Sequence, residues 1–178
     1  MNAHAQVINY QYDSLPVVEL LSEFRKTSTD RKKIMRLLEL DWPFALDVSR
    51  RASELLSGSL LAGNQRLVFH CLDQALNAYG RAALKPDHLR LVAFCETLIN
   101  GVARAICSIR LSDQEGNSWT IEKRQPLSLW LREHAAEAIH IEVVAHEEQG
   151  ERYRSAEEII KSMVLSPTVR EIIEDREQ

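Results

Sequence analysis

The segment that most constrains the fold is HLRLVAFCETLINGVARAI, at residues 88–106, which predicts a helix that is apolar on nearly every side. Arg90, Thr97 and Arg104 recur every seven residues within it and form one narrow polar stripe. A helix with so little polar surface is stable only when other helices surround it. The segment therefore predicts a helical bundle with residues 88–106 at its centre.

The same 3.6-residue period predicts four further helices before this segment. They begin near residues 15, 31, 43 and 64, and the last of them ends at Pro86. Residues with side-chain oxygens stand where N-caps are expected: Ser14, Asp41, Asn64 and Asp87. Residues 14–105 are therefore expected to form a bundle of about five helices.

Beyond residue 105 the hydrophobic period changes from 3.6 to two. The sequence AICSIRLSDQEGNSWTIEKR alternates between apolar and polar residues on both sides of DQEGN, whose residues favour a turn. This pattern predicts a β-hairpin with strands near 105–111 and 118–123. The helical period returns in QPLSLWLREHAAEA, where Leu127, Trp130 and Leu131 share one face.

Residues 139–154 allow two interpretations. Four β-branched residues between 139 and 144 favour a strand, whereas a helix continued from upstream would end at Gly150. The continued helix would place Glu147 and Glu148 at its negative end, which is unfavourable. We therefore favour the strand.

Two short helices are predicted at the end of the chain. Ser155 and Glu158 form a capping box at the start of the first, and Ser166 followed by Pro167 starts the second. Helices of about ten residues need docking to be stable. These helices are therefore expected to cover the hairpin or to offer a surface to a partner.

Together these patterns predict one α-rich α+β domain at residues 14–178, after an N-terminal segment at 1–13. Its N-terminal bundle of about five helices, 14–105, precedes a small antiparallel β-hairpin element and three C-terminal helices within 106–178. The chain has 178 residues, 45% hydrophobic and 27% charged, which is typical of a globular domain. No apolar run approaches the roughly 20 residues that span a bilayer, so no membrane partner is expected.

The cysteine usage and the first residues both favour a cytoplasmic location. Cys71, Cys95 and Cys107 are odd in number and lack CxxC spacing, so we interpret them as buried thiols in a reducing compartment. The start of the chain, MNAHAQVINYQYDS, lacks the basic and apolar regions of a secretory signal.

Three of the six histidines lie in HAAEAIHIEVVAH, at His134, His140 and His146. In a helix, residues six apart are rotated by about 240°, so the three rings point in different directions. In a strand, His140 and His146 share a face but lie about 20 Å apart, whereas zinc–nitrogen bonds measure about 2 Å. A site would need a partner residue from elsewhere in the chain. We therefore predict no metal, no cofactor and no catalytic residue.

Two groups of residues bear on nucleic acids. Arg81 and His88 match the R-x(4–6)-H spacing of HEPN-like helical ribonucleases, but Pro86 breaks the helix that would present them. The residues of a basic face on two successive helices resemble a helix-turn-helix reader: Arg31, Lys32, Lys33, Arg36, Arg50 and Arg51. The join LELDWPF lacks the glycine turn that such motifs often use. The net charge of −4 argues against nucleic-acid binding by the whole surface.

Large aromatic side chains are few, and an exposed pair of them would anchor a partner. The candidates, which otherwise belong to the core, are Trp42, Phe44, Trp119 and Trp130. The sequence contains no G-x-S-x-G, G-x-G-x-x-G or G-x(4)-G-K-[ST] motif. We therefore expect a cytoplasmic regulatory or adaptor protein, not an enzyme, that binds a protein partner or forms a homodimer. The alternatives are a nucleic-acid-binding transcriptional regulator and a small HEPN-like helical ribonuclease.

Overall fold

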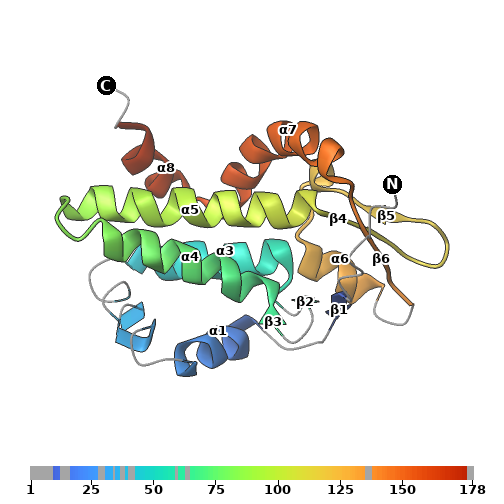
Figure 1. Ribbon diagram of the computed structural model, residues 1–178, viewed down its shortest axis with the longest axis horizontal. Coiled ribbons are helices and arrows are strands. Elements are labelled where there is room, and N and C mark those ends of the chain that lie inside the picture. The colour runs from blue at the N-terminus through green and yellow to red at the C-terminus, as the bar shows by residue number, and fades with distance from the viewer. Residues whose placement is uncertain are drawn as a thin grey trace, which may run out of the picture.

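The computed structural model describes residues 10–12, 17–27, 31–33, 35–36, 39, 43–58, 60–62, 65–134 and 138–175. The helices, labelled as in Figure 1, are α1 (Val17–Lys26), α3 (Pro43–Leu56), α4 (Leu67–Arg81), α5 (Asp87–Cys107), α6 (Leu127–Glu133), α7 (His146–Val164) and α8 (Pro167–Glu174), with a 3₁₀ turn, η1 (Ile121–Lys123). The strands are β1 (Tyr10–Tyr12), β2 (Leu60–Ala62), β3 (Gln65–Arg66), β4 (Ile109–Ser112), β5 (Ser118–Trp119) and β6 (His140–Val143). The chain is an α-rich α+β protein, as predicted.

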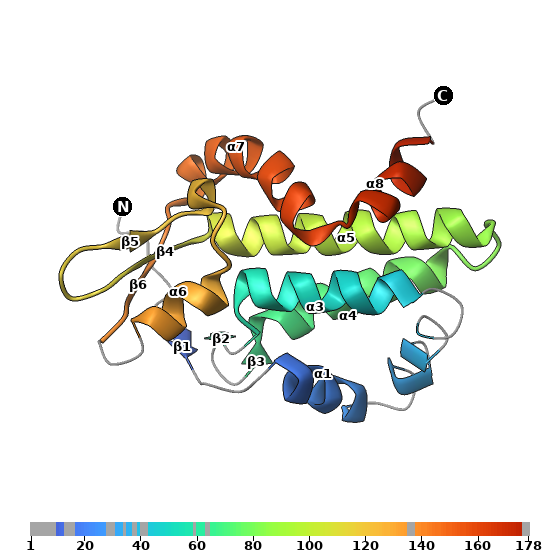
Figure 2. The ribbon, with the colours of Figure 1, turned by 180° about the vertical axis from the view of Figure 1, so that it is seen from behind.

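Helix α5 is the long element on which the others pack. Helices α3 and α4 lie along one side of it, and α7 and α8 cross its other side (Figures 1 and 2). Its side chains Leu91, Phe94, Cys95, Leu98 and Val102 have no exposed surface. Residues 88–106 are therefore apolar because several helices pack around them, as the sequence predicted.

The polar stripe of α5 differs from the predicted one. Beyond the first two residues of the helix, the exposed residues are Glu96, Asn100 and Arg104, which are four apart, whereas Arg90 and Thr97 are half-buried. Residues four apart stack on one side of a helix, because each turn takes 3.6 residues. Arg90 instead lies over the Tyr79 ring of α4, 4.0 Å from its centroid. One side of α5 thus stays open in the part of the chain that the structure describes.

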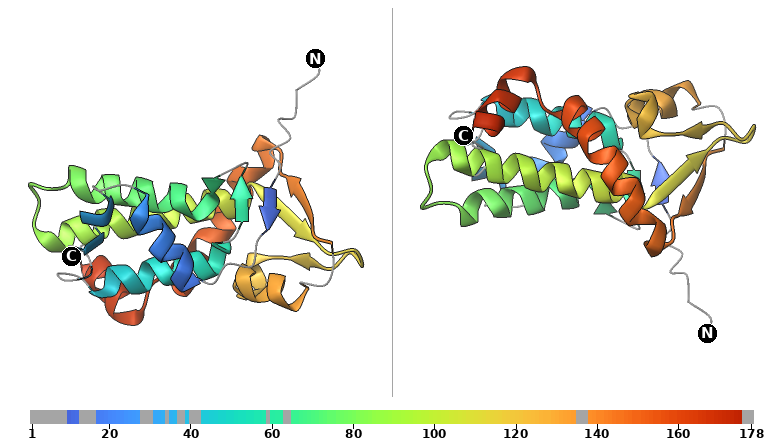
Figure 3. Two further views of the ribbon diagram at one scale, coloured as in Figure 1. Left: turned by 90° about the horizontal axis from the view of Figure 1, so that it is seen from below. Right: turned by 90° about the horizontal axis from the view of Figure 1, so that it is seen from above.

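Two small antiparallel sheets flank the helices. The first, in the order β1-β2-β3, pairs residues 10–12 with residues 60–62 and was not predicted. The second, in the order β5-β4-β6, lies at one end of the bundle (Figure 3). It contains the predicted hairpin, but α5 continues through Cys107 and β5 ends at Trp119. The strands are therefore shorter than the predicted 105–111 and 118–123.

Neither interpretation holds over the whole of residues 139–154. The favoured strand is confirmed at His140–Val143, and α7 then begins at His146. Glu147 and Glu148 lie in its first turn, where carboxylates interact favourably with the helix dipole. Gly150 lies inside this helix and does not end it.

Two predicted helix starts, at Asn64 and Ser155, are wrong, whereas those near Pro43 and at Ser166 are right. Ser155 lies in the middle of α7, where its hydroxyl donates to the backbone oxygen of Arg152 (3.0 Å) and caps nothing. The helix predicted from residue 64 begins instead at Leu67, after strand β3. Ser166 is the N-cap of α8, and its hydroxyl accepts a hydrogen bond from the Val169 N–H, with Pro167 in the first turn.

Arg152 of α7 fastens the junction between the bundle and the second sheet. Its guanidinium donates to the carbonyl oxygens of Cys107 (3.0 Å) and Ile109 (3.1 Å), on either side of Ser108. The last carbonyls of a helix lack partners within that helix, so a cation here satisfies one of them and suits the helix dipole. Arg152 therefore fixes the direction in which β4 leaves α5.

The three cysteines are buried free thiols, as predicted. Burial raises the pKa of Cys71 and of Cys95 to about 12. Burial also raises the pKa of Cys107. Among the helices that the structure describes, none combines the length and the apolar character needed to cross a membrane.

Candidate functional site

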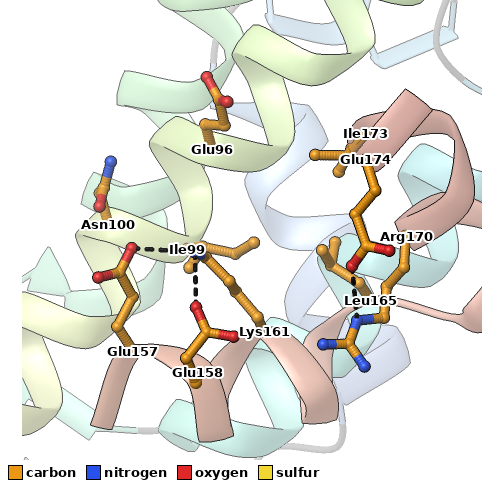
Figure 4. A pocket seen from close by; sticks show the side chains of 10 residues that line it. All are labelled: Glu96, Ile99, Asn100, Glu157, Glu158, Lys161, Leu165, Arg170, Ile173 and Glu174. Carbon is orange, nitrogen blue, oxygen red and sulfur yellow. Dashed lines mark hydrogen bonds and ion pairs between the residues drawn. The ribbon is translucent and has the colours of Figure 1, made fainter. Parts of the chain in front are cut away.

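A groove of about 650 Å³ lies between α5, α7 and α8 (Figure 4). Its lining residues are Glu96, Ile99 and Asn100 of α5, Glu157, Glu158 and Lys161 of α7, Leu165 between the helices, and Arg170, Ile173 and Glu174 of α8. The groove lies along the side of α5 that stays open.

The local sequence between α7 and α8 makes this groove. Leu165 is extended (φ −92°, ψ 129°) and ends α7, and Ser166 with Pro167 starts a new helix at once. Because the two helices are not collinear, α8 turns away from α7 above α5 (Figure 1). Ile99 and Leu165, which are 3% and 5% exposed, form an apolar floor.

The rim of the groove is acidic. Its lining residues include four glutamates but only two basic residues. Lys161 lies between two of the carboxylates, with Nζ 3.2 Å from Glu157 and 3.0 Å from Glu158. The hydrogen bond to Glu158 raises the pKa of Lys161. Arg170 is 3.9 Å from Glu174 and lies on the opposite wall.

The three histidines of residues 134–146 do not share one helix or strand. His134 follows α6, His140 is in β6 and His146 begins α7. No group of three or more His, Cys, Asp or Glu side chains that could hold a metal occurs among the described residues. His134 does meet a partner from elsewhere, Asp113 in the turn after β4, with Nε2 3.3 Å from Oδ2. The sequence analysis missed this pair.

The Asp113–His134 pair connects two elements and offers no free ring nitrogen to a substrate. The His134 Nδ1 lies 2.7 Å from the Trp130 carbonyl oxygen, and Nε2 faces the carboxylate. The His134 ring stacks on the Trp130 ring with centroids 4.3 Å apart. Burial works to raise the pKa of Asp113, but hydrogen bonds from Asn117 lower it below its usual value. A general base needs a nitrogen within reach of the substrate, and both nitrogens are engaged here.

Half of the proposed basic face, three arginines, is paired with acids. Arg31 donates to Asp73, and Arg50 bridges Asp47 and Glu54. Arg51 also donates to Asp47 (2.7 Å). Burial works to raise the pKa of Asp47, but the hydrogen bonds from Arg50 and Arg51 lower it below its usual value. These arginines therefore carry local ion pairs.

The remaining members of that face are Lys32, Lys33 and Arg36, which are exposed. Residues 38 and 40–42, which form most of the predicted helix-turn-helix join, lie outside the described residues. Nucleic-acid binding by this face stays a prediction.

Arg81 and His88 lie on separate helices. Arg81 is the last residue of α4 and His88 the second of α5, with Pro86 in the connection between them. Both side chains are exposed. The helix is therefore interrupted before Pro86, as predicted, and no single helix presents the pair.

The four aromatic candidates have different positions. Trp119 and Trp130 are core residues, 5% and 3% exposed, and the Trp119 indole donates to the Gln125 carbonyl oxygen (2.9 Å). Phe44 is half-buried against the core, and Trp42 lies outside the described residues. Neither of the two buried tryptophans offers its ring to a partner.

Sequence reasoning also missed the groove, although α5 carries a signal for it. Glu96, Asn100 and Arg104 are spaced four apart in a mainly apolar segment, which indicates one open side. Comparison with protein-family models, with curated proteins and with solved structures finds no match to this chain.

Proposed function

We propose that this chain is a non-catalytic, protein-binding regulator or adaptor of the cytosol, whose α5–α7–α8 groove binds a basic amphipathic helical segment of a protein partner. The observation that carries the proposal is the combination of an apolar floor with an acidic rim in one groove of about 650 Å³. Amphipathic helices dock into such grooves through apolar residues at helical spacing.

The composition of the groove favours a protein segment over a small metabolite. Six of its ten lining residues are charged, whereas small-molecule sites are mostly apolar with few polar groups. The floor residues Ile99 and Leu165 accept apolar anchors, and the surplus of carboxylates suits lysine or arginine residues beside those anchors. Charge complementarity of this kind mainly sets specificity and association rate.

Lys161 gives the groove a basis for selecting its partner. In the free chain its ammonium group balances Glu157 and Glu158. A basic side chain of the partner can replace it at one of these carboxylates, whereas an acidic segment has to compete with Glu157 and Glu158 for Lys161. The groove therefore favours basic helices over acidic ones.

The non-catalytic part of the proposal rests on the state of the reactive side chains. The described thiols are buried with raised pKa values, and both nitrogens of His134 are engaged. Buried thiols also suit a reducing compartment such as the cytosol.

The test is a binding titration with a designed probe. The probe is a fluorescein-labelled helical peptide with leucines at i, i+3, i+4 and i+7 and lysines on both flanks. The control is the same peptide with every lysine replaced by glutamate. We expect the basic peptide to bind with an affinity that weakens as salt is added, because surface charges are screened. The acidic peptide should bind at least about tenfold more weakly, which corresponds to ~1.4 kcal/mol.

Two variants localise the binding. E157Q/E174Q removes two carboxylates from the rim, whereas E147Q/E151Q removes two exposed carboxylates of α7 outside the groove. Only the first should weaken the basic peptide and flatten its salt dependence. Equal effects of the two variants, or equal binding of the two peptides, would show that the groove is not the site.

A further inference from the structure

We propose that a second copy of this chain pairs with the outer edge of β6, so that the two sheets join into one antiparallel sheet across a twofold axis. The proposal goes beyond the groove, because β6 lies in the sheet at the other end of α5 (Figure 3). It rests on the direction of the backbone groups, the exposure of the strand and the register that its charges select.

The backbone of β6 leaves hydrogen-bonding groups unpaired on its outer side. The Val144 N–H donates to the Ser108 carbonyl oxygen (2.8 Å), so residue 144 faces β4. Backbone groups alternate in direction along a strand, so residues 140 and 142 also face β4. The N–H and C=O groups of Ile141 and Val143 therefore point outward, and no described strand lies beyond β6.

This edge is short and carries the charged Glu142, but it lacks other features that normally protect an edge strand. Residues 138–145, AIHIEVVA, contain no lysine, proline or glycine. Val143 is 41% exposed, and Ile139 and Ile141 are only partly buried against the core. These three side chains lie on the same face of the sheet as the buried Leu111, which is the register partner of Ile141. A neighbouring strand would extend the apolar face and cover them.

The direction of the backbone groups and the charges select one register. Only odd-numbered residues of β6 face outward, so residue 141 or 143 of one copy must meet an odd-numbered residue of the other. When Ile141 meets Ile141 of the second copy, Glu142 lies opposite His140 of that copy, twice by symmetry. Ile139 then lies opposite Val143, so apolar side chains meet on the inner face. In this register each cross-strand pair joins either an acidic residue to a histidine or two apolar residues.

The neighbouring registers are less favourable. Moving the axis to residue 140 places Glu142 opposite Ala138 and loses both Glu142–His140 contacts, and moving it to residue 142 places Glu142 opposite Glu142. Like charges directly opposite are destabilising. Within the described residues neither the His140 nor the Glu142 side chain has an ion pair or a hydrogen bond, and Arg110, next to Glu142, is paired with Glu148 (2.5 Å). Glu142 is therefore available to His140 of the second copy.

Disulfide trapping tests the register directly. In the proposed register residues 141 face each other as a hydrogen-bonded pair about 5.5 Å apart, within the range that a disulfide bridges. The matched variant E142C places the Cα atoms of its two cysteines on a diagonal of about 7–8 Å, beyond that range. The native thiols are buried and give little background. We expect I141C, and not E142C, to form a covalent dimer under mild oxidation.

Sedimentation with charge-exchanged variants tests the interface without cysteines. The unmodified chain should sediment as a dimer that dissociates on dilution. H140E places like charges opposite each other twice and should raise the dimer dissociation constant about tenfold. H140E/E142K restores opposite charges and should restore the dimer. Both positions are exposed, so circular dichroism should show an unchanged fold.

Three results would overturn the proposal: a monomer at every concentration, a dimer that H140E leaves unaffected, or cross-linking of E142C in place of I141C. The basic peptide is titrated against the same H140E variant. Because the groove lies on α5, α7 and α8, peptide binding there should be unchanged. Failure of the β6 interface and failure of the groove are therefore seen separately.

Discussion

Gly101 of α5 lies against Cys71 of α4, and replacing it by alanine separates two opposing effects. A Cβ added at Gly101 meets Cβ and Sγ of Cys71 at 3.3 Å and its Cα at 3.4 Å. Gly150, inside α7, has nothing within 4 Å of the same added atom. Both substitutions improve helix propensity, but only the first crowds a neighbouring helix.

The magnitudes follow from these contacts. Alanine in place of glycine in a helix interior contributes about 1 kcal/mol, so G150A should raise the free energy of unfolding by about that amount. G101A gains the same propensity but forces α4 and α5 apart by a few tenths of an ångström, and overpacking costs about 1–3 kcal/mol. We expect G101A to lower the free energy of unfolding by about 1 kcal/mol.

Thermal unfolding followed by circular dichroism measures the difference. For a chain of this size, 1 kcal/mol shifts Tm by about 2–4 °C. G150A should therefore melt above the unmodified chain and G101A below it. An equal rise of Tm in both variants would refute the close α4–α5 contact. A third variant, C71A/G101A, removes the sulfur that the new methyl group would meet. The G101A substitution should therefore cost less stability in the C71A background than in the unmodified chain.

Three further predictions concern the junctions and the thiols. R152M should lower the free energy of unfolding in urea by about 2–3 kcal/mol, because two carbonyl oxygens at the α5–β4 junction lose a charged donor; an unchanged midpoint would contradict this. Asp113 has a lowered pKa in the folded chain, so its contribution to stability is complete above the unfolded-state value of about 3.9 and is lost as the pH falls through the folded value. The stability difference between the unmodified chain and D113N should therefore grow as the pH rises through this acidic window and stay constant above it, as urea titrations at each pH will show. Cys71 and Cys95 should not react with a thiol reagent at neutral pH until the chain is unfolded, because burial raises the pKa of each to about 12; rapid labelling of the native chain, detected by mass spectrometry, would contradict their burial.

Local patterns predicted the elements whose cause is local. The Ser166–Pro167 start of α8 is confirmed, because an N-cap hydroxyl and a proline act on the adjacent turn alone. The strand at 140–143 is confirmed for a similar reason, since β-branched residues suit extended backbone. The α-rich α+β class followed from the change of period near residue 105.

Elements with distant causes could not be read in this way. Ser155 and Glu158 have capping-box spacing, but the same spacing occurs inside a helix, and α7 begins at His146 after the extended residue Ala145. Strand β1 has only three residues, and nothing near them indicates that they pair with residues 60–62.

The groove and the Asp113–His134 pair were missed for the same reason. Glu96 and Asn100 indicate that α5 has an open side, but they do not indicate that α8 forms a wall there. Asp113 was interpreted as part of a turn, and its contact with His134 depends on how α6 packs beside the sheet. Such sites require the tertiary arrangement, because their residues come from separate elements.

The first sheet has a consequence for the order in which the chain folds. Helices α4 and α5 are joined by residues 82–86 alone, so their contacts close only a short loop. Strand β1 reaches β2 only after the chain from residue 12 to residue 60 has closed on itself. Local contacts form faster than distant ones. We therefore expect the α4–α5 hairpin to be structured in the transition state and β1 to dock late, so that amides at residues 10–12 exchange with solvent faster than those at 91–103.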